Sequence, residues 1–207
     1  VCSSDPAMNE DRELSRILSK SIPFQLFAKK YDIKSFELFD TWVKECINIF
    51  REFDSSTKNP NVAIVDFNDK GSPNEFEVFK EAFIRNGYNT EIVDARDLKY
   101  IDGKLFFNDM KIDIVYRRLV TRDLLERADE IPAFIEAAKE GNVCIVGPIK
   151  SQIIHNKIIF KVLHDIDTLD LLTDEERTFI KNHIPYTAKF EGDGFDFKEL
   201  IEDKDKY

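Results

Sequence analysis

Two adjacent arginines, Arg117 and Arg118, follow an apolar run within the stretch "KIDIVYRRLVTRDLL" at residues 111–125. A guanidinium offers a planar fork of donors that suits a carboxylate or a phosphate. Successive side chains of a strand point to opposite faces, so at most one of the two arginines faces a given site. The competing interpretation is structural: a salt bridge to one of the acids that the fold could bring close, namely Asp94, Asp123 or Glu126.

Other polar residues follow the apolar runs that we interpret as strands. Asp66 ends one such run, Asp94 ends the next, and Gly147-Pro148 follows a third. In an open parallel sheet, ligands bind beyond the carboxyl ends of the strands. Acids at these positions also cap the turn that follows, which is the structural alternative for both aspartates.

Lys157 lies in "IIHNKIIF", with apolar residues on both sides. Its ammonium group could reach a polyphosphate. Alternatively, the side chain could extend along the edge of a helix and keep its charge in water. The residues alone leave both interpretations open.

Several well-known chemistries lack their motifs. The sequence holds no G-x-G-x-x-G after its first strand, no G-x-x-x-x-G-K-[ST], no H-E-x-x-H and no G-x-S-x-G. The 3 histidines are scattered, and the acids of "EGDGFDFKELIED" do not match the positions of a calcium loop. A net charge of −10 argues against a general nucleic-acid binder, which needs a basic face.

The cysteines and the hydropathy bear on the compartment. The 3 cysteines have no metal-type spacing, and Cys46 and Cys144 lie in apolar runs, which predicts buried thiols and a reducing, cytoplasmic location. The sequence shows no secretion leader and no apolar run of about 18 residues, the length that spans a membrane. It begins at Val1 rather than Met, so we expect a piece of a longer protein.

The elements that must position these residues form an α/β fold. β-Branched apolar runs predict buried strands at 61–67, 89–95 and 142–148, and "KLFFNDMKIDIVYRR" predicts a hairpin turning at Asn108 and Asp109, then a strand. Capping residues and apolar spacing predict helices that start at Ser4 or Asp5, at Ser35, at Ser72 (with Glu75, ending at Gly87), near 121 and 131, at Ser151 and at Thr173. We therefore expect an open, mostly parallel sheet with helices on both faces, preceded by a helical arm.

Four stretches of the chain resemble the circularly permuted ATP-grasp ligases, the family that includes glutathionylspermidine synthase and the eukaryotic-type glutathione synthetases. They are "SSDPAMNEDREL", "ELFDTWV", the segment from "NVAIVDF" to "IDIVYRR", and "VGPIKSQIIHNKIIFKVLHD". The resemblance implies a Rossmann-like, pre-ATP-grasp sheet domain. It divides the chain into a helical arm (1–58), a substrate-binding α/β domain (59–150) and a helical segment (151–207).

The resemblance also implies an activity. Such ligases use ATP and Mg²⁺ to join a small-molecule or peptide carboxylate to an amine through an acyl phosphate. By position in the family pattern, Arg118 would bind the substrate carboxylate, with Arg117 as the alternative. Ser3 and Ser4 would contact the substrate, and Lys157 would reach ATP. No residue of the chain matches a catalytic or metal-binding position.

Two departures from the family pattern shape the expectation for this chain. The family's Glu-x-Asn magnesium motif would lie just before Val1, and a further ATP-binding lysine with a glycine-rich lid would lie after Tyr207. We therefore expect a substrate-binding fragment that is inactive alone. The alternative from another class is a non-catalytic α/β module that binds a ligand or a partner.

Overall fold

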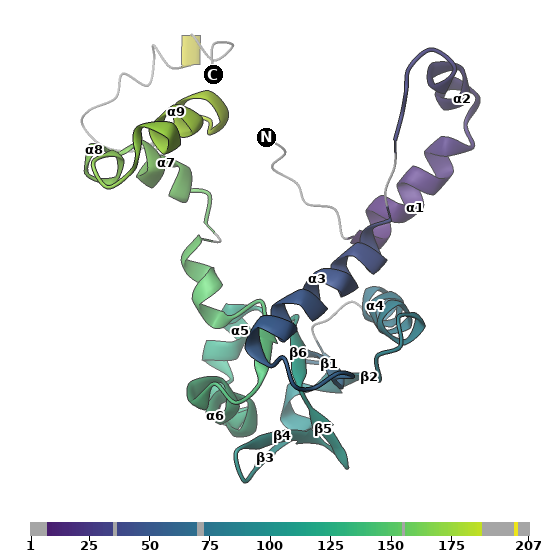
Figure 1. The fold of residues 1–207 in the computed structure, drawn as a ribbon, viewed down its shortest axis with the longest axis vertical. Coiled ribbons are helices and arrows are strands. Elements are labelled where there is room, and N and C mark those ends of the chain that lie inside the picture. Colours follow the sequence, from purple (N-terminus) through teal and green to yellow (C-terminus); the bar gives the residue numbers. More distant parts are fainter. Residues whose placement is uncertain (1–7, 35–36, 70–72, 155, 188–200, 203–207) are drawn as a thin grey trace. The chain divides into compact units, whose positions relative to one another are not determined.

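The structure, a computed structural model, describes residues 8–34, 37–69, 73–154, 156–187 and 201–202. The chain forms two compact units, one ending at Pro148 and the other beginning at Ile149. Figure 1 shows their helices and strands along the chain.

Parallel strands form the centre of the first unit. Among the described residues, a 4-stranded sheet has the order β2-β1-β6-β7 with every pair parallel, and a 3-stranded antiparallel sheet has the order β3-β4-β5. The parallel strands are β1 (Val62–Asp66), β2 (Thr90–Asp94), β6 (Ile114–Arg117) and β7 (Cys144–Val146). The antiparallel strands are β3 (Leu98–Ile101), β4 (Lys104–Phe107) and β5 (Met110–Ile112). The expected α/β fold with a mostly parallel sheet is confirmed.

Helices lie in the first unit where the sequence predicts them, and one additional helix was not predicted. The helices are α1 (Met8–Ser19), α2 (Ile22–Ala28), α3 (Leu38–Phe53), α4 (Pro73–Arg85), α5 (Thr121–Glu126) and α6 (Pro132–Glu140), with short 3-10 turns η1 (Ala95–Asp97) and η2 (Ala128–Glu130). The additional helix is α2, which begins after its cap Ser21. The carboxylate of Glu37 caps α3 by accepting from the backbone N–H groups of Phe39, at 3.0 Å, and Asp40. The expected cap Ser35 is therefore wrong, and the other expected caps, Ser4, Asp5 and Ser72, lie outside the described residues.

The core lies between α3, α4 and one face of the parallel sheet. The apolar stripe of α3 is buried, and it packs with α4 side chains such as Phe79 and with Ile64, Ile114 and Tyr116 of the sheet. Residues of the opposite strand parity, among them Val65 and Val115, are also fully buried. Helices α5 and α6 lie on the other side of the strands from α4 (Figure 1). Both faces of the sheet are therefore covered, as expected for parallel strands.

The small antiparallel sheet holds one strand that the sequence analysis missed. The hairpin between β4 and β5 turns at Asn108, which has φ +51°, as predicted. A second turn at Asp102 (φ +49°) and Gly103 (φ +71°) joins β3 to β4. Asp-Gly is a strong signal for a two-residue hairpin, so the sequence does contain the information for β3.

The second unit is helical. Its described elements are η3 (Ile149–Ile154), α7 (Ile159–His164), α8 (Ile166–Leu169) and α9 (Asp174–His183). The continuous helix expected from Ser151 is wrong, because the chain turns at Asn156–Lys157. The Asn156 side-chain oxygen accepts from the backbone N–H of Ile158 at 2.9 Å, a local bond that competes with a helix. The predicted helix start at Thr173 is confirmed, and Thr173 forms a capping box with Glu176 at the start of α9.

Candidate functional site

The carboxyl ends of the parallel strands bring polar groups to one edge of the sheet. Asp66 ends β1 in register with Asp94 of β2, and Arg117 ends β6 in register with Val65 of β1. Gly147 follows β7, the neighbour of β6. Four segments that are distant in sequence therefore meet at the edge where open parallel sheets bind ligands.

Arg118 follows β6 and turns toward α4. Its Nη2 lies 3.1 Å from Oε2 of Glu75, and its Nη1 donates to the Tyr116 hydroxyl at 3.1 Å. The guanidinium carbon lies 5.6, 5.9 and 5.7 Å from the ring centroids of Phe76, Phe79 and Tyr116. Hydrogen bonds and ring packing together hold this guanidinium in one place.

The same geometry leaves donors of Arg118 available. The Glu75 side chain is 7% exposed, whereas that of Arg118 is 33% exposed. Of the five N–H donors of a guanidinium, one goes to Tyr116 and one to Glu75, and Nε is buried without a hydrogen-bond partner in the described part of the chain. One N–H on each Nη atom remains, a pair suited to a carboxylate.

Arg117 makes a different set of contacts. Its Nε donates to the carbonyl oxygen of Gly147, and its Nη1 donates to that of Leu119, with the Thr121 hydroxyl at 3.5 Å. Burial lowers the pKa of this guanidinium. Among the described residues, no carboxylate forms an ion pair with it. Arg117 therefore ties the end of β6 to the end of β7.

The two arginines thus have separate surroundings, as strand alternation predicts. Arg118 does form an ion pair, as the structural alternative predicts, but its partner in the described part of the chain is none of the three expected acids. Asp94 pairs with Arg96, and Glu126 pairs with Arg122. The carboxylate beside Arg118 is instead Glu75.

Sequence reasoning misses Glu75 as part of this site, because an acid at this position also fits the start of the helix that follows Ser72. The residue is 5% exposed and lies on the buried side of α4, four positions before Phe79 and seven before Ala82. An acid at helical spacing with buried apolar residues needs a partner, since an unpaired buried charge is costly. That spacing was the available signal.

Asp66 and Asp94 both bind the turn that follows their strand, as the structural alternative predicts. Asp66 accepts from the backbone N–H of Phe67 at 2.8 Å, and burial raises the pKa of its carboxyl. Asp94 accepts from the backbone N–H groups of Asn68 and Arg96, each at 3.0 Å. Its bonds to the Arg96 guanidinium, at 2.7 and 2.6 Å, are the main cause that lowers its pKa.

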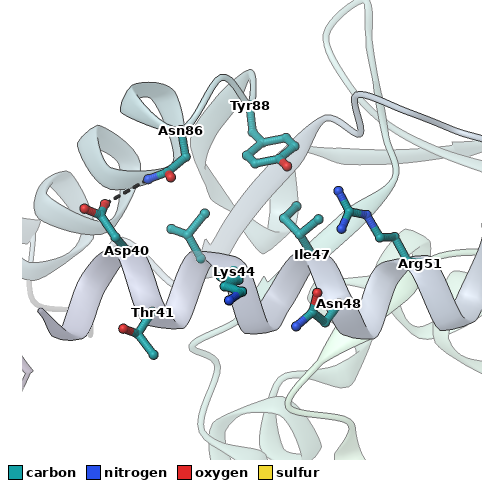
Figure 2. A pocket seen from close by; sticks show the side chains of 9 residues that line it. Asp40, Thr41, Lys44, Ile47, Asn48, Arg51, Asn86 and Tyr88 are labelled. Carbon is teal, nitrogen blue, oxygen red and sulfur yellow. Dashed lines mark hydrogen bonds between the residues drawn. The ribbon is translucent and has the colours of Figure 1, made fainter. Parts of the chain in front are cut away.

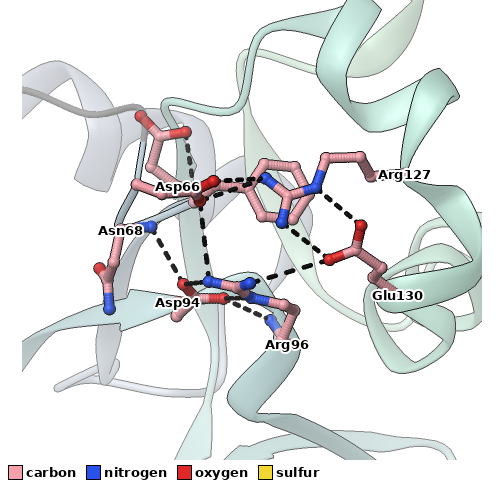
Figure 3. Close-up of polar contacts among 8 residues, drawn as sticks. Asp66, Asn68, Asp94, Arg96, Arg127 and Glu130 are labelled. Atoms are coloured by element: carbon pink, nitrogen blue, oxygen red, sulfur yellow. Dashed lines mark hydrogen bonds and ion pairs between the residues drawn. The ribbon is translucent and has the colours of Figure 1, made fainter.

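Asp94 belongs to a larger group of side chains, which we call the Phe67 cluster (Figure 3). The guanidinium carbon of Arg127 lies 3.8 Å from the centroid of the buried Phe67 ring, and that of Arg96 lies 5.8 Å from it. Both arginines pair with carboxylates, which come from Asp69, Asp94 and Glu130. The cluster joins the segment after β1 to η1 and η2.

The remaining predicted site residues lie elsewhere. Lys157 is exposed and lies in the turn before α7, in the second unit, rather than within a helix. Ser3 and Ser4 lie outside the described residues. The structure brings together Arg117 and Arg118 at one edge of the sheet.

A separate hollow of about 410 Å³ lies along α3 (Figure 2). Lys44 and Arg51 line it from α3, and Asn86 and Tyr88 line it from the segment after α4. Asp40 at its rim accepts from Asn86 at 2.8 Å, and hydrogen bonds lower its pKa. None of the strand-end residues lines this hollow, so it is distinct from the edge that carries Arg118.

The described residues hold neither a cluster of metal ligands nor a membrane-spanning helix. No group of three or more His, Cys, Asp and Glu residues in those ranges could hold a metal ion. The same ranges contain no helix with the length and hydropathy needed to cross a bilayer.

A parallel sheet with a fixed arginine at the carboxyl ends of its strands occurs in many protein families. The observation that identifies the family is a match to a family model. The family described as a circularly permuted ATPgrasp matches residues 10–199. The chain belongs to the circularly permuted ATP-grasp family. Membership indicates ATP-dependent, ligase-like chemistry, and ATP-grasp proteins in general use ATP and Mg²⁺. Among curated proteins, none matches the chain significantly.

Proposed function

We propose that this ATP-grasp chain is the substrate-binding part of a carboxylate–amine ligase of the glutathionylspermidine synthase-like type, with residues 59–150 as its pre-ATP-grasp domain. Enzymes of that type activate the acid as an acyl phosphate, which an amine then attacks. The family match over residues 10–199 and the arginine at the ligand edge support the proposal. The role assigned to the described residues at this edge is to bind and orient the acid.

The observation that carries the proposal is the way Arg118 is held. Glu75 and Tyr116 fix its guanidinium, while about a third of the side chain stays exposed. A guanidinium fixed in this way offers its two remaining Nη donors to a carboxylate without a large loss of rotamer freedom on binding.

The other site residues take supporting roles in the proposal. Arg117 fixes the ends of β6 and β7 through the carbonyl oxygens of Gly147 and Leu119. For Ser3, Ser4 and Lys157 the family pattern suggests substrate and ATP contacts. These three assignments remain predictions.

The direct test is acid binding by the 207-residue chain. Titration with a panel of small carboxylic acids and dipeptides, followed by NMR chemical shifts, should show a site that includes Arg118. Arg118→Ala should weaken binding by about 10- to 100-fold, since hydrogen bonds to charged groups contribute about 1.5–3 kcal/mol.

Arg122→Ala is the matched control. Arg122 is an exposed arginine in the following helix that pairs with Glu126 at 2.8 Å, and its loss should leave acid binding unchanged. If Arg118→Ala binds every acid as the parent chain does, the carboxylate assignment is wrong. If no acid binds and the complete protein releases no ADP with ATP, Mg²⁺, acids and amines, the ligase proposal fails and the non-catalytic module is favoured.

A further inference from the structure

The first two helices carry a basic and apolar surface. Neither α1 nor α2 has a buried residue. Residues 14–31, which we call the basic arm, contain four cations and no acid. Six large apolar side chains of the arm are between 49% and 73% exposed. They are Leu14, Ile17, Leu18, Ile22, Leu26 and Phe27.

The second unit carries a surface of the opposite charge. Residues 165–176, which we call the acidic face, contain six acids and no base and cover α8 and the start of α9. Ile166 and Leu171 within it are 73% and 85% exposed. Within the described helices of this unit, Ile180 is the buried residue.

Both surfaces are short of packing partners in the described ranges. Isolated helices shorter than about 12–15 residues are marginal in water, and most helices gain stability by burying an apolar face. Contiguous exposed apolar patches mark interaction sites. Binding of a partner to the exposed apolar surface of each helical segment would therefore stabilise these helices.

Charge decides which partner fits. Two basic arms would repel each other, as would two acidic faces, because like charges brought together are unfavourable. The arm and the acidic face are complementary in both charge and hydropathy. All 40 acids of the chain lie outside the arm, so a second copy presents the arm with an acidic protein surface.

We propose that the basic arm of one molecule docks on the acidic face of a second copy, and that the exchange is reciprocal. Reciprocal exchange closes a two-fold dimer, whereas one-way exchange would extend into a chain of molecules. The arm then buries Leu26 and its apolar neighbours, and Lys29 and Lys30 approach exposed acids such as Glu175. This dimer is independent of the ligase activity.

The test is the oligomeric state of the 207-residue chain. Sedimentation velocity up to about 200 µM should show a dimer at about 50 mM NaCl, and the dissociation constant should rise about tenfold at about 500 mM NaCl because salt screens the charges. Lys29→Glu combined with Lys30→Glu should weaken the dimer about tenfold or more. Asp170→Lys combined with Glu175→Lys should do the same, and neither change touches the capping pair Thr173 and Glu176.

The combination of all four changes gives the sharpest result, since it restores opposite charges. It should return the dissociation constant to within about threefold of the parent chain. Lys58→Glu with Lys139→Glu is the matched control, made at exposed lysines outside the arm, and should leave the dimer intact. Leu26→Ser and Leu171→Ser should each weaken the dimer while circular dichroism stays unchanged.

Several outcomes would overturn the dimer. One is a chain that stays monomeric at about 200 µM and low salt. Another is a dissociation constant of the fourfold variant that stays as high as that of either double variant. A third is a monomeric chain that binds vesicles of phosphatidylcholine and phosphatidylserine and loses this binding with Lys29→Glu and Lys30→Glu, since the arm would then fit an anionic lipid surface.

Discussion

The Phe67 cluster and the Arg117–Arg118 pair both place two arginines near the carboxyl ends of parallel strands, but they balance charge differently. In the cluster, Arg96 and Arg127 meet three carboxylates. At the end of β6, Glu75 is the carboxylate paired with Arg118, and Arg117 donates to carbonyl oxygens.

This difference indicates that the Phe67 cluster is structural, whereas Arg118 is available to bind a ligand. In the cluster, the carboxylates outnumber the arginines and the Phe67 ring is covered. Charge pairing and burial of the ring are therefore enough to account for Arg96 and Arg127 at these positions. Beside β6, Arg118 forms an ion pair with Glu75, whereas the contacts of Arg117 are with neutral oxygen atoms. Within the described ranges, Arg118 keeps unused N–H donors on an exposed edge. Guanidinium donors that remain unused at the carboxyl edge of a parallel sheet are suited to recognise a carboxylate.

The largest expected effect is on stability and tests the Phe67 cluster. Phe67→Ala removes a fully buried ring and the surface on which the Arg127 guanidinium lies. We expect a loss of about 3–4 kcal/mol in the free energy of unfolding, measured by urea denaturation. Phe53→Ala, at a ring that is 49% exposed, should cost much less. Similar losses for the two variants would show that the cluster does not stabilise the fold.

The next effect concerns Glu75, the acid that forms an ion pair with Arg118. Glu75→Gln leaves the Arg118 guanidinium without its counter-charge in a mostly buried site. Removal of one member of a buried pair costs about 3–5 kcal/mol, and we expect about 2 kcal/mol because Arg118 is partly exposed to solvent, which screens its charge. Glu77→Gln, at an exposed position of the same helix, is the control for urea denaturation. Equal stability of the two variants would contradict a structural role for the pair.

A third prediction compares the two strand-end aspartates at different pH. Asp94 has a lowered pKa in the folded chain, so its charged form stabilises the fold above the unfolded pKa of about 3.9, and this stabilisation is lost as the pH falls through the folded value. Asp66 has a raised pKa, so its charged form costs stability above the same unfolded pKa.

Asp94→Asn should therefore lower the free energy of unfolding at pH 7 by roughly 1–2 kcal/mol, and Asp66→Asn should raise it slightly. Both differences from the parent chain should shrink as the pH falls below about 4. Urea denaturation at several pH values measures them. Effects of the same sign for both variants would contradict the assigned pKa shifts.

The smallest effect separates the two adjacent arginines. Arg117→Lys replaces a fork that reaches two carbonyl oxygens with a single ammonium group, at a cost of about 1 kcal/mol in stability. It should leave acid binding unchanged. Arg118→Lys should weaken acid binding about tenfold because a lysine cannot offer paired donors. If Arg117→Lys is the variant that weakens binding, the roles of the two residues are reversed.

The sequence predicted the elements whose signals are local. The run from β1 through α4 to β2 was predicted by two apolar strands with a helix between them, and Gly87 at φ +90° follows that helix as expected. Parallel pairing then implied that Asp66, Asp94 and the two arginines would share one edge. These steps need periodicity and capping chemistry, which a single sequence carries.

The missed features depend on other kinds of information. Glu75 and Arg118 are 43 residues apart, so their contact depends on how α4 packs against the sheet. The break at Asn156 depends on one side-chain bond that competes with the helix. Strand β3 was missed although Asp102-Gly103 marks its turn. Tertiary contacts account for the first miss, and unrecognised turn chemistry accounts for the other two.

The two buried thiols have a consequence for following motions of the chain. Cys46 of α3 and Cys144 of β7 are buried, and burial raises the pKa of Cys46 to about 12 and that of Cys144 to about 11. Thiolates are the reactive form, so both groups should resist alkylation while the helix stays on the sheet. In a Cys2→Ser background, the rate of alkylation would report how often α3 separates from β7. Added acid substrate should lower this rate if its binding stabilises the packing of α3 on the sheet.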